Sequence, residues 1–132
     1  MKQISVFLEN RPGTLTDILQ LLKKGQVNLR AISIADTVDY GICRIVCDDP
    51  CKAVTVLKEA GIAASESEIT ALEVAEDKIG SIADIVSIFA AEGVNLAYLY
   101  TFILDGRLIM ACRPTDAKAA AAVCAKHSFK TI

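Results

Sequence analysis

Tryptophan is absent from this 132-residue sequence, and aromatic residues make up only 5% of it, although 53% of the residues are hydrophobic. Any core must therefore be built mainly from Ile, Val, Leu and Ala. Domains that read single-stranded RNA stack bases on aromatic side chains of their central strands. The sequence has one periodic aromatic set, Tyr98, Tyr100 and Phe102, which would lie on a single strand. This scarcity argues against an RNA-binding function.

A strong charge of either sign is also missing. The formal net charge is −2 and the isoelectric point is about 5.4, so the chain offers no basic surface for nucleic acid or an anionic membrane. The longest nearly continuous apolar stretch, Leu96 to Leu104, is far shorter than the roughly 20 residues that span a bilayer. The N-terminus lacks the apolar block and the cleavage site of a signal peptide. We therefore expect a cytoplasmic protein.

The sequence has little material for catalysis. Its single histidine, His127, lies between Lys126 and Ser128, and we interpret it as a surface residue without a partner. The sequence contains no glycine-rich loop for phosphate groups, and no nucleophile with a neighbouring base is visible. We therefore expect a protein that is not an enzyme and that needs no cofactor.

The five cysteines are interpreted as free thiols, since nothing in the sequence indicates export. Four of them lie within apolar stretches, where cysteine behaves as a small hydrophobic residue: Cys43, Cys47, Cys112 and Cys124. The spacing of Cys43, Cys47 and Cys51 raises the alternative of a metal site. Zinc sites usually have closer pairs and a fourth ligand, so we favour core packing and expect no metal.

The chain contains an internal repeat. A shift of 67 positions places the segment from Gly13 to Leu19 on the segment from Gly80 to Val86, and it also places Val27-Asn28-Leu29 on Val94-Asn95-Leu96. Self-similarity with so few gaps indicates two copies of one structural unit. We assign residues 1–67 to the first repeat and residues 68–132 to the second.

Each repeat is predicted to contain a strand, a helix, two strands, a helix and a strand. The helix after Gly13 has Leu15, Ile18 and Leu22 at helical spacing, and Thr14 and Ser81 are candidates for helix caps. Gly25 and Gly93 would end these helices in the left-handed conformation. The expected strands are residues 4–8, 29–35, 42–47 and 62–65, and then 69–74, 96–104, 108–113 and 129–132. We therefore predict an α+β fold of two ferredoxin-like βαββαβ repeats, each an antiparallel sheet with helices on one face.

Asp105-Gly106 predicts a tight hairpin turn between two strands of the second repeat. The first of these strands carries Tyr98, Tyr100 and Phe102, which alternate and so share one face. We expect them to pack under the helices or against the other repeat; otherwise they flank a ligand.

The loop between the first strand and the first helix is the best candidate for a binding site. Gly13 lets a ligand approach the backbone, and the free amides at the start of the helix suit a carboxylate. Asn10 and Asn28 each offer a donor and an acceptor, as an amino acid requires. The alternative, which spacing alone favours, is that Asn10 forms a turn and Asn28 bonds to its own backbone.

The segment from Glu9 to Leu15 and the segment from Gly25 to Leu29 resemble the signature of the ACT domain, a ligand-sensing βαββαβ module of amino-acid metabolism. The segments 78–82 and 92–96 resemble the same signature in the second repeat. The resemblance implies that paired modules bind a small molecule, often an amino acid, where this loop of one module faces the second strand of its neighbour. By position, the implied ligand-binding residues are Asn10, Arg11, Gly13, Thr14, Leu15 and Asn28, with Asp77, Gly80, Ser81, Ile82, Asn95 and Leu96 in the second repeat.

The resemblance leads us to expect a stand-alone tandem ACT regulatory protein that binds an amino acid or a similar small metabolite and signals to a partner protein. Open edge strands favour a homodimer. The alternative is a regulatory or structural subunit of an amino-acid-metabolism enzyme that binds no ligand. Two differences from the family pattern favour that alternative: Leu8 lies where some amino-acid-binding members have histidine, and Lys78-Ile79 lies where the family often has Arg-Pro.

Overall fold

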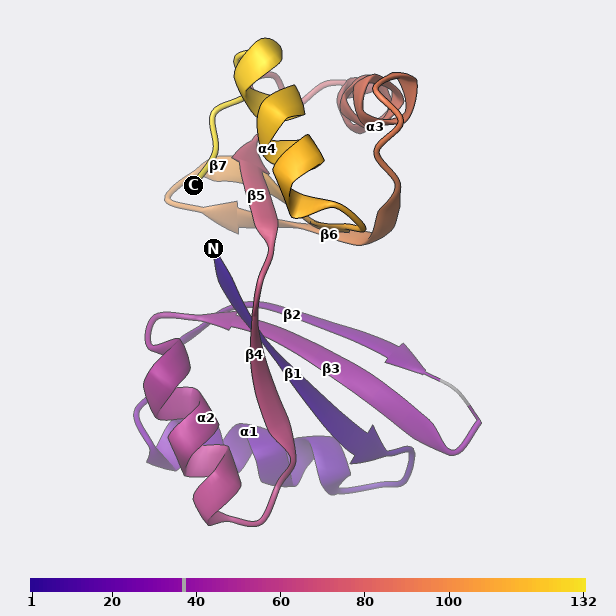
Figure 1. The fold of residues 1–132 in the computed structure, drawn as a ribbon. Helices are drawn as coiled ribbons and strands as arrows, with labels where there is room; N and C mark the ends of the chain where they lie inside the picture. Colours follow the sequence, from indigo (N-terminus) through magenta and orange to yellow (C-terminus); the bar gives the residue numbers. More distant parts are fainter. Residues whose placement is uncertain (37) are drawn as a thin grey trace. The chain divides into compact units, whose positions relative to one another are not determined.

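The computed structural model describes residues 1–36 and 38–132. The chain divides into two compact units, one of Lys2–Glu68 and the other of Ile69–Ile132 together with Met1 (Figure 1). Within these described ranges, no helix is long and apolar enough to cross a membrane.

The first unit has the predicted βαββαβ order. Its strands form a four-stranded antiparallel sheet in the order β2-β3-β1-β4, and its two helices cover one face (Figure 1). The elements are β1 (Lys2–Glu9), α1 (Thr14–Lys24), β2 (Leu29–Asp36), β3 (Tyr40–Cys47), α2 (Pro50–Glu59) and β4 (Ala64–Glu68).

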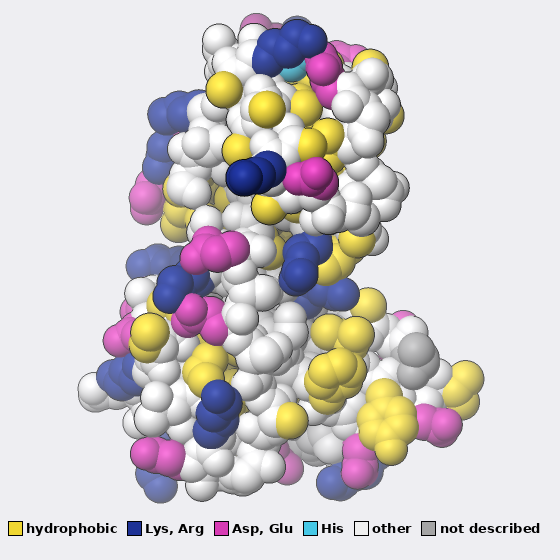
Figure 2. Space-filling model, viewed as in Figure 1, with side chains coloured by type: hydrophobic (Ala, Val, Ile, Leu, Met, Phe, Trp, Pro, Cys, Tyr) yellow, Lys and Arg dark blue, Asp and Glu magenta, His cyan; other side chains and the backbone are white. Residues whose placement is uncertain are grey.

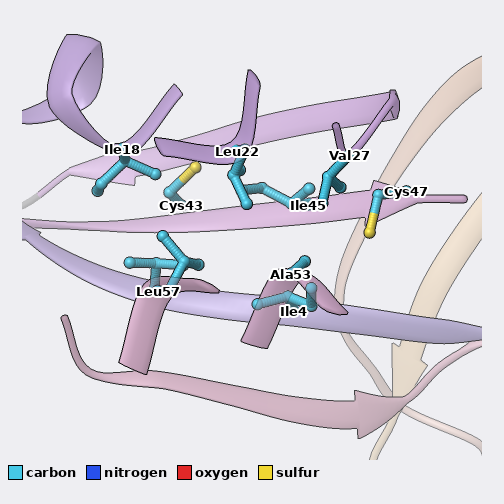
Figure 3. Close-up of a cluster of buried hydrophobic side chains, with 10 residues drawn as sticks. Ile4, Ile18, Leu22, Val27, Cys43, Ile45, Cys47, Ala53 and Leu57 are labelled. Carbon is cyan, nitrogen blue, oxygen red and sulfur yellow. The ribbon is translucent and has the colours of Figure 1, made fainter. Parts of the chain in front are cut away.

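Alternation along the strands and helical spacing in α1 and α2 point apolar side chains of both into one core in this unit. Ile4 lies opposite Ile45 and Val6 lies opposite Cys43, so all four point to the face that the helices cover. Figure 3 shows this layer meeting the buried residues Ile18 and Leu22 of α1 and Ala53 and Leu57 of α2. Full burial of a side chain such as Ile45 or Leu57 contributes about 1.5–3 kcal/mol to folding.

The second unit repeats this arrangement with a shorter sheet. The elements are β5 (Thr70–Glu73), α3 (Ser81–Ala91), β6 (Leu96–Leu104), β7 (Arg107–Pro114) and α4 (Ala117–Lys126). The strands form a three-stranded antiparallel sheet in the order β5-β7-β6. Between β6 and β7, Asp105 and Gly106 both have positive φ, which confirms the predicted tight turn. The two units together confirm the predicted fold class.

The predicted last strand, residues 129–132, is wrong in extent. Only Thr131 forms a bridge, to Leu72, and two further backbone bonds join Glu73 to Lys130 and Ile132 to Ala71. Ser128 adopts a left-handed turn, and the ring of Phe129 stacks on Phe89 with 6.0 Å between the centroids. Packing of Phe129 into the core thus takes the place of regular strand pairing at the start of this segment.

The register of β6 corrects the prediction for its aromatic side chains. Tyr100 lies opposite Ala111 and Phe102 lies opposite Ile109, whereas the core below the helices takes Met110 and Cys112 from β7. Residues opposite each other in an antiparallel pair point to the same face. The aromatic set of β6 therefore lies on the face away from α3 and α4. The prediction that these residues pack under the helices is wrong, and packing against the other repeat stays a prediction.

The glycines at the helix ends also differ from one another. Gly93 has φ +76, as predicted, but Gly25 has φ −73, and the left-handed residue in the first repeat is Gln26. A Cβ on Gly25 would lie 2.8 Å from a methyl carbon of Val56 in α2. Gly25 is therefore required by the close approach of α2 and not by its backbone conformation.

Candidate functional site

The loop from β1 to α1 is held in shape by bonds to its own backbone. Gly13 adopts the left-handed conformation at φ 93 and immediately precedes the helix. The hydroxyl of Thr14 donates to the carbonyl oxygen of Glu9 at 2.7 Å, which closes the loop. The Nε of Arg11 lies 2.6 Å from a carboxylate oxygen of Glu9. Both of these side chains are exposed, so the ion pair itself adds little stability.

The loop from β5 to α3 repeats the same bonds 67 positions further along. Gly80 has φ 92, and the hydroxyl of Ser81 donates to the carbonyl oxygen of Glu76 at 2.5 Å. Lys78 forms an ion pair with Glu76, as Arg11 does with Glu9. The hydrogen bond between them lowers the pKa of the Glu76 carboxyl and raises the pKa of the Lys78 ammonium. The two loops are therefore copies in conformation as well as in sequence.

The prediction that Thr14 and Ser81 cap their helices is wrong. Gly13 and Gly80 occupy the cap positions, and the two hydroxyls turn back into the loops, so neither helix is capped by a side chain. The second helix of each repeat differs, because the carboxylates of Asp49 and Asp116 cap α2 and α4. An uncapped first turn leaves backbone amides available to an acceptor. In both repeats this happens only at the loop that resembles the ACT signature.

The two asparagines of the first repeat are not brought together within their unit. The side chain of Asn10 donates to the carbonyl of Val38 at 3.5 Å, in the turn after β2. Asn28 precedes β2, where its backbone N–H donates to the carboxylate of Asp48 and its carbonyl oxygen accepts from the backbone N–H of Asp48. The whole of β2 thus separates them, which is roughly 25 Å for an eight-residue strand. In the second repeat the carbonyl oxygen of Asn95 accepts from the backbone N–H of Thr115.

The apolar candidates serve the cores. Leu15 packs against the core of the first unit, and Ile82 and Leu96 pack against the core of the second. Asp77 lies in the exposed part of the β5–α3 loop. Of the candidate residues, each unit brings together those of its loop and of the first turn of the helix that follows.

The second unit contains a pocket of about 340 Å³ beside its loop. Its walls come from three places: residues 73–76 with Lys78, the first turns of α3, and residues 128–130 after α4. Of the lining residues, only Ser81 was predicted from the sequence to bind a ligand. The C-terminal segment lies far from the loop in the chain, and no local pattern connects the two.

Elsewhere titratable groups form ion pairs, and Figure 2 shows acidic and basic side chains interspersed on the visible surface. The prediction that His127 lacks a partner is wrong, because its Nε2 lies 3.2 Å from a carboxylate oxygen of Glu92, which also binds Lys126 at 2.5 Å. Hydrogen bonds from Lys126 and His127 lower the pKa of Glu92. Among the side chains that the structure describes, no group of three or more His, Cys, Asp or Glu residues is placed to hold a metal ion.

The thiols divide into four that are buried and one that is exposed. The prediction of core packing is confirmed for Cys43, Cys47, Cys112 and Cys124 and is wrong for Cys51, which lies exposed on α2. Burial raises the pKa of the Cys43 and Cys112 thiols to about 11, so both are protonated at neutral pH and are poor nucleophiles.

Comparisons with known proteins agree with this fold. The family model described as the ACT domain pair matches residues 1–132. Protein BT0572 from Bacteroides thetaiotaomicron is 30% identical, with a TM-score of 0.91 over 99% of this chain and 90% of that chain. The fold is also similar to the regulatory subunit of aspartate kinase from Thermus thermophilus in its ligand-free form, at 18% identity and a TM-score of 0.68 over 96% of this chain and 91% of that one. A structure of aspartokinase alpha and beta subunits matches at 16% identity and a TM-score of 0.63, over 95% of this chain and 90% of that one.

A search of curated proteins gives no match. With a family match along its full length and two units of the expected fold, the chain belongs to the ACT domain pair family.

Proposed function

We propose that this chain is a regulatory protein that binds an amino acid or a similar small metabolite between neighbouring ACT modules and passes the signal to a partner protein. The observation that carries the proposal is the duplicated loop. Gly13 and Gly80 share a left-handed conformation, each is followed by an uncapped helix, and in each loop a hydroxyl bonds back to the last carbonyl before the loop, that of Glu9 or Glu76. Free amides at a helix start suit the carboxylate of an amino acid.

The separation of Asn10 from Asn28 supports a site between modules. Because these residues lie at opposite ends of β2, a ligand that touches both kinds of position needs the loop of one module and the second strand of another. The neighbouring module can belong to the same chain or to a second chain. A ligand held by two modules favours one arrangement of them, and a coupling of this kind is typically worth about 1–3 kcal/mol.

Edge strands support the homodimer that we include in this proposal. β2 and β6 each lie at one edge of a sheet, and both expose apolar side chains there. Ile32 and Ile34 of β2 are each 43% exposed, and Ile103 of β6 is 61% exposed. An open edge strand with apolar side chains is a natural surface for pairing with a second chain.

The proposal is tested by thermal-shift measurements with the twenty amino acids and related metabolites. Ligand at about 100 times its dissociation constant stabilises the folded protein by about 2.7 kcal/mol, so a true ligand raises the melting temperature by several degrees. Asn10→Ala and Asn95→Ala are measured beside their counterparts in the other repeat, Asp77→Ala and Asn28→Ala. Loss of the shift in one loop variant and one strand variant supports a site between modules. A flat panel with a folded protein contradicts the proposal.

A second candidate function is a regulatory or structural subunit that binds no ligand. Leu8, in the position where some ACT members have histidine, packs against the core and presents no polar group, and Ile79, in place of the family proline, is fully exposed. A flat panel together with co-purification of an amino-acid-metabolism enzyme would favour this candidate. A melting shift abolished by Asn10→Ala would exclude it.

A further inference from the structure

We infer that the first unit has a binding site on the face of its sheet opposite to the helices, and that its ligand has an anionic head group and an apolar chain. The inference is independent of the proposed function. Two adjoining pockets of ordinary size for small ligands form the site, and both contain Phe7 of β1. The pocket at the β4 edge measures about 350 Å³ and is lined by Ser5, Phe7, Lys58, Ala63, Ala64 and Ser65. The pocket towards β2 measures about 550 Å³ and is lined by Phe7, Ala35, Asp36, Tyr40, Gly41 and Ile42.

The strand register explains why the apolar side chains share one face. Phe7 lies opposite Ile42, and Ala35 lies opposite Ile42 on the other side of β3. Residues opposite each other in an antiparallel pair point to the same face, so the three form an apolar row across β1, β3 and β2. The core on the other face takes the neighbouring residues Val6 and Cys43. Phe7 is 62% exposed, so its ring offers apolar surface to a ligand.

A row of hydrogen-bond donors runs beside this apolar row. Ser5 lies opposite Ser65 on β4 and opposite Arg44 on β3. The amide nitrogen of Gln3, a fully buried residue, donates to the hydroxyl oxygen of Ser5 at 3.2 Å. That bond uses the oxygen as an acceptor, so the hydroxyl proton can be donated to another partner. Lys58, from the last turn of α2, lines the same pocket and adds a positive charge.

The acidic side chains near this pocket point away from it. Glu66 of β4 lies opposite the core residue Ile4, and Lys2 binds its carboxylate at 2.6 Å. In β2, Asp36 follows Ala35, so its side chain points away from the apolar row. Among the described residues that line the pocket at the β4 edge, none is acidic. This end of the site therefore attracts an anion and repels a cation.

A ligand that fits both rows carries its charge at one end. Its head group would accept from Ser5 and Ser65 and lie near Lys58. Its chain would extend over Phe7 towards Ala35. Because adjacent strands lie about 4.8 Å apart, the path from β4 to β2 is roughly 14 Å long (Figure 1). This length suits a medium-chain fatty acid or an alkyl phosphate, which share an anionic head with several acceptor oxygens.

The second unit repeats the sheet but not this site. Ile109 lies 67 positions after Ile42, and it lies opposite Glu73, which therefore takes the place of Phe7. Helix α4 has Ala125 at the position of the lysine in the last turn of α2. Neither the aromatic ring nor the lysine is repeated, so we expect one ligand for each chain.

The test is isothermal calorimetry of the full chain with octanoate, at concentrations where it does not form micelles. 1-Octanol and octylamine keep the chain but change the head group, and acetate keeps the head group without the chain. Octanoate should bind at one site, and 1-octanol should bind at least about fivefold more weakly, the factor for one surface charge pair. Octylamine and acetate should give no binding heat. Octyl phosphate, titrated in parallel, shows which anionic head group the site prefers.

Two variants are each compared with a matched control. Lys58→Gln is measured beside Lys52→Gln, which removes another exposed lysine of α2. Phe7→Ala is measured beside Ile79→Ala, which removes a fully exposed apolar side chain from the second unit. Melting temperatures verify that all four are folded. Octanoate binding should weaken about fivefold in Lys58→Gln, and about tenfold in Phe7→Ala, the factor for about two methylene groups that lose their contact. The controls should change it by less than about twofold.

Amide spectra of the same protein locate the ligand independently. Octanoate should shift the signals of Ser5, Phe7 and Ser65 and leave those of Thr14 and Ser81 in place. Shifts around Thr14 or Ser81 instead, or octylamine binding as tightly as octanoate, would overturn the inferred site. Octanoate binding that neither variant weakens would also overturn it, as would a folded protein that binds neither octanoate nor octyl phosphate. These outcomes leave the proposed binding of an amino acid unaffected.

Discussion

Gly25, at the C-terminal end of α1, is expected to tolerate no larger side chain. Its φ of −73 is an ordinary backbone conformation, so alanine causes no backbone strain. A Cβ would lie 2.8 Å and 3.3 Å from the two methyl carbons of Val56, although carbon atoms normally approach to about 3.5–4.0 Å. Val56 cannot turn away at low cost, because a β-branched side chain is stiff about χ1. The helices must therefore separate locally.

The expected cost of Gly25→Ala follows from two opposing effects. Overpacking typically costs about 1–3 kcal/mol, and replacing glycine recovers about 0.4–1 kcal/mol by restricting the unfolded chain. We expect the free energy of unfolding to fall by about 1–2 kcal/mol. Urea denaturation of the wild type, Gly25→Ala, Val56→Ala and the double variant measures this. The alanine at position 25 should cost little in the Val56→Ala background. A variant as stable as the wild type, or a cost that persists without the valine methyl groups, would refute the steric explanation.

Three further predictions concern other parts of the fold. Gly93→Ala should lower the free energy of unfolding by about 1–2 kcal/mol because alanine is strained at φ +76, and no neighbouring substitution should restore it, since no atom lies within 4 Å of the added Cβ. The pKa of Glu92 is lowered beside Lys126 and His127, so this residue stabilises the folded state above its ordinary pKa, and the contribution disappears as the pH falls through the lowered value. Glu92→Gln should therefore reduce the drop in the urea midpoint between neutral and acidic pH. An unchanged drop would contradict the pairing. A thiol reagent should modify Cys51 quickly in the native protein, and only denaturant should expose the remaining four cysteines, Cys43, Cys47, Cys112 and Cys124.

The repeat and the element order were readable from the sequence because each depends on local spacing. Leu15, Ile18 and Leu22 recur at the helical period, and Ile4 and Val6 alternate as a strand does. The tight turn at Asp105-Gly106 has a strong preference for these two residue types. These features needed no knowledge of distant contacts, and the structure contains all of them except a regular strand at residues 129–132.

Features that depend on distant partners were missed. In β6 the residues on both faces are apolar, so period two shows that Tyr98, Tyr100 and Phe102 share a face but not which face meets the helices. The partner of His127 is Glu92, 35 residues earlier in the chain. The pocket beside α3 is completed by residues 128–130, which carry no motif.

For the candidate site, the sequence indicated the loops but not their internal bonds. Thr and Ser often cap helices, but the hydroxyl of Thr14 or Ser81 can bond either forward to the helix or back to the loop. Because a left-handed glycine takes the cap position before each of them, the hydroxyl bonds back to the loop. The roles of Asn10 and Asn28 in ligand binding stay a prediction.

The hydroxyl bond that closes each loop ends on a backbone carbonyl, so it does not depend on the side chains of the three residues that follow that carbonyl. Asn10-Arg11-Pro12 in one copy and Asp77-Lys78-Ile79 in the other follow the same path for this reason. A duplicated gene that keeps Gly13 with Thr14 and Gly80 with Ser81 is free to diversify the three residues before each glycine, and each copy can acquire its own selectivity without losing its fold.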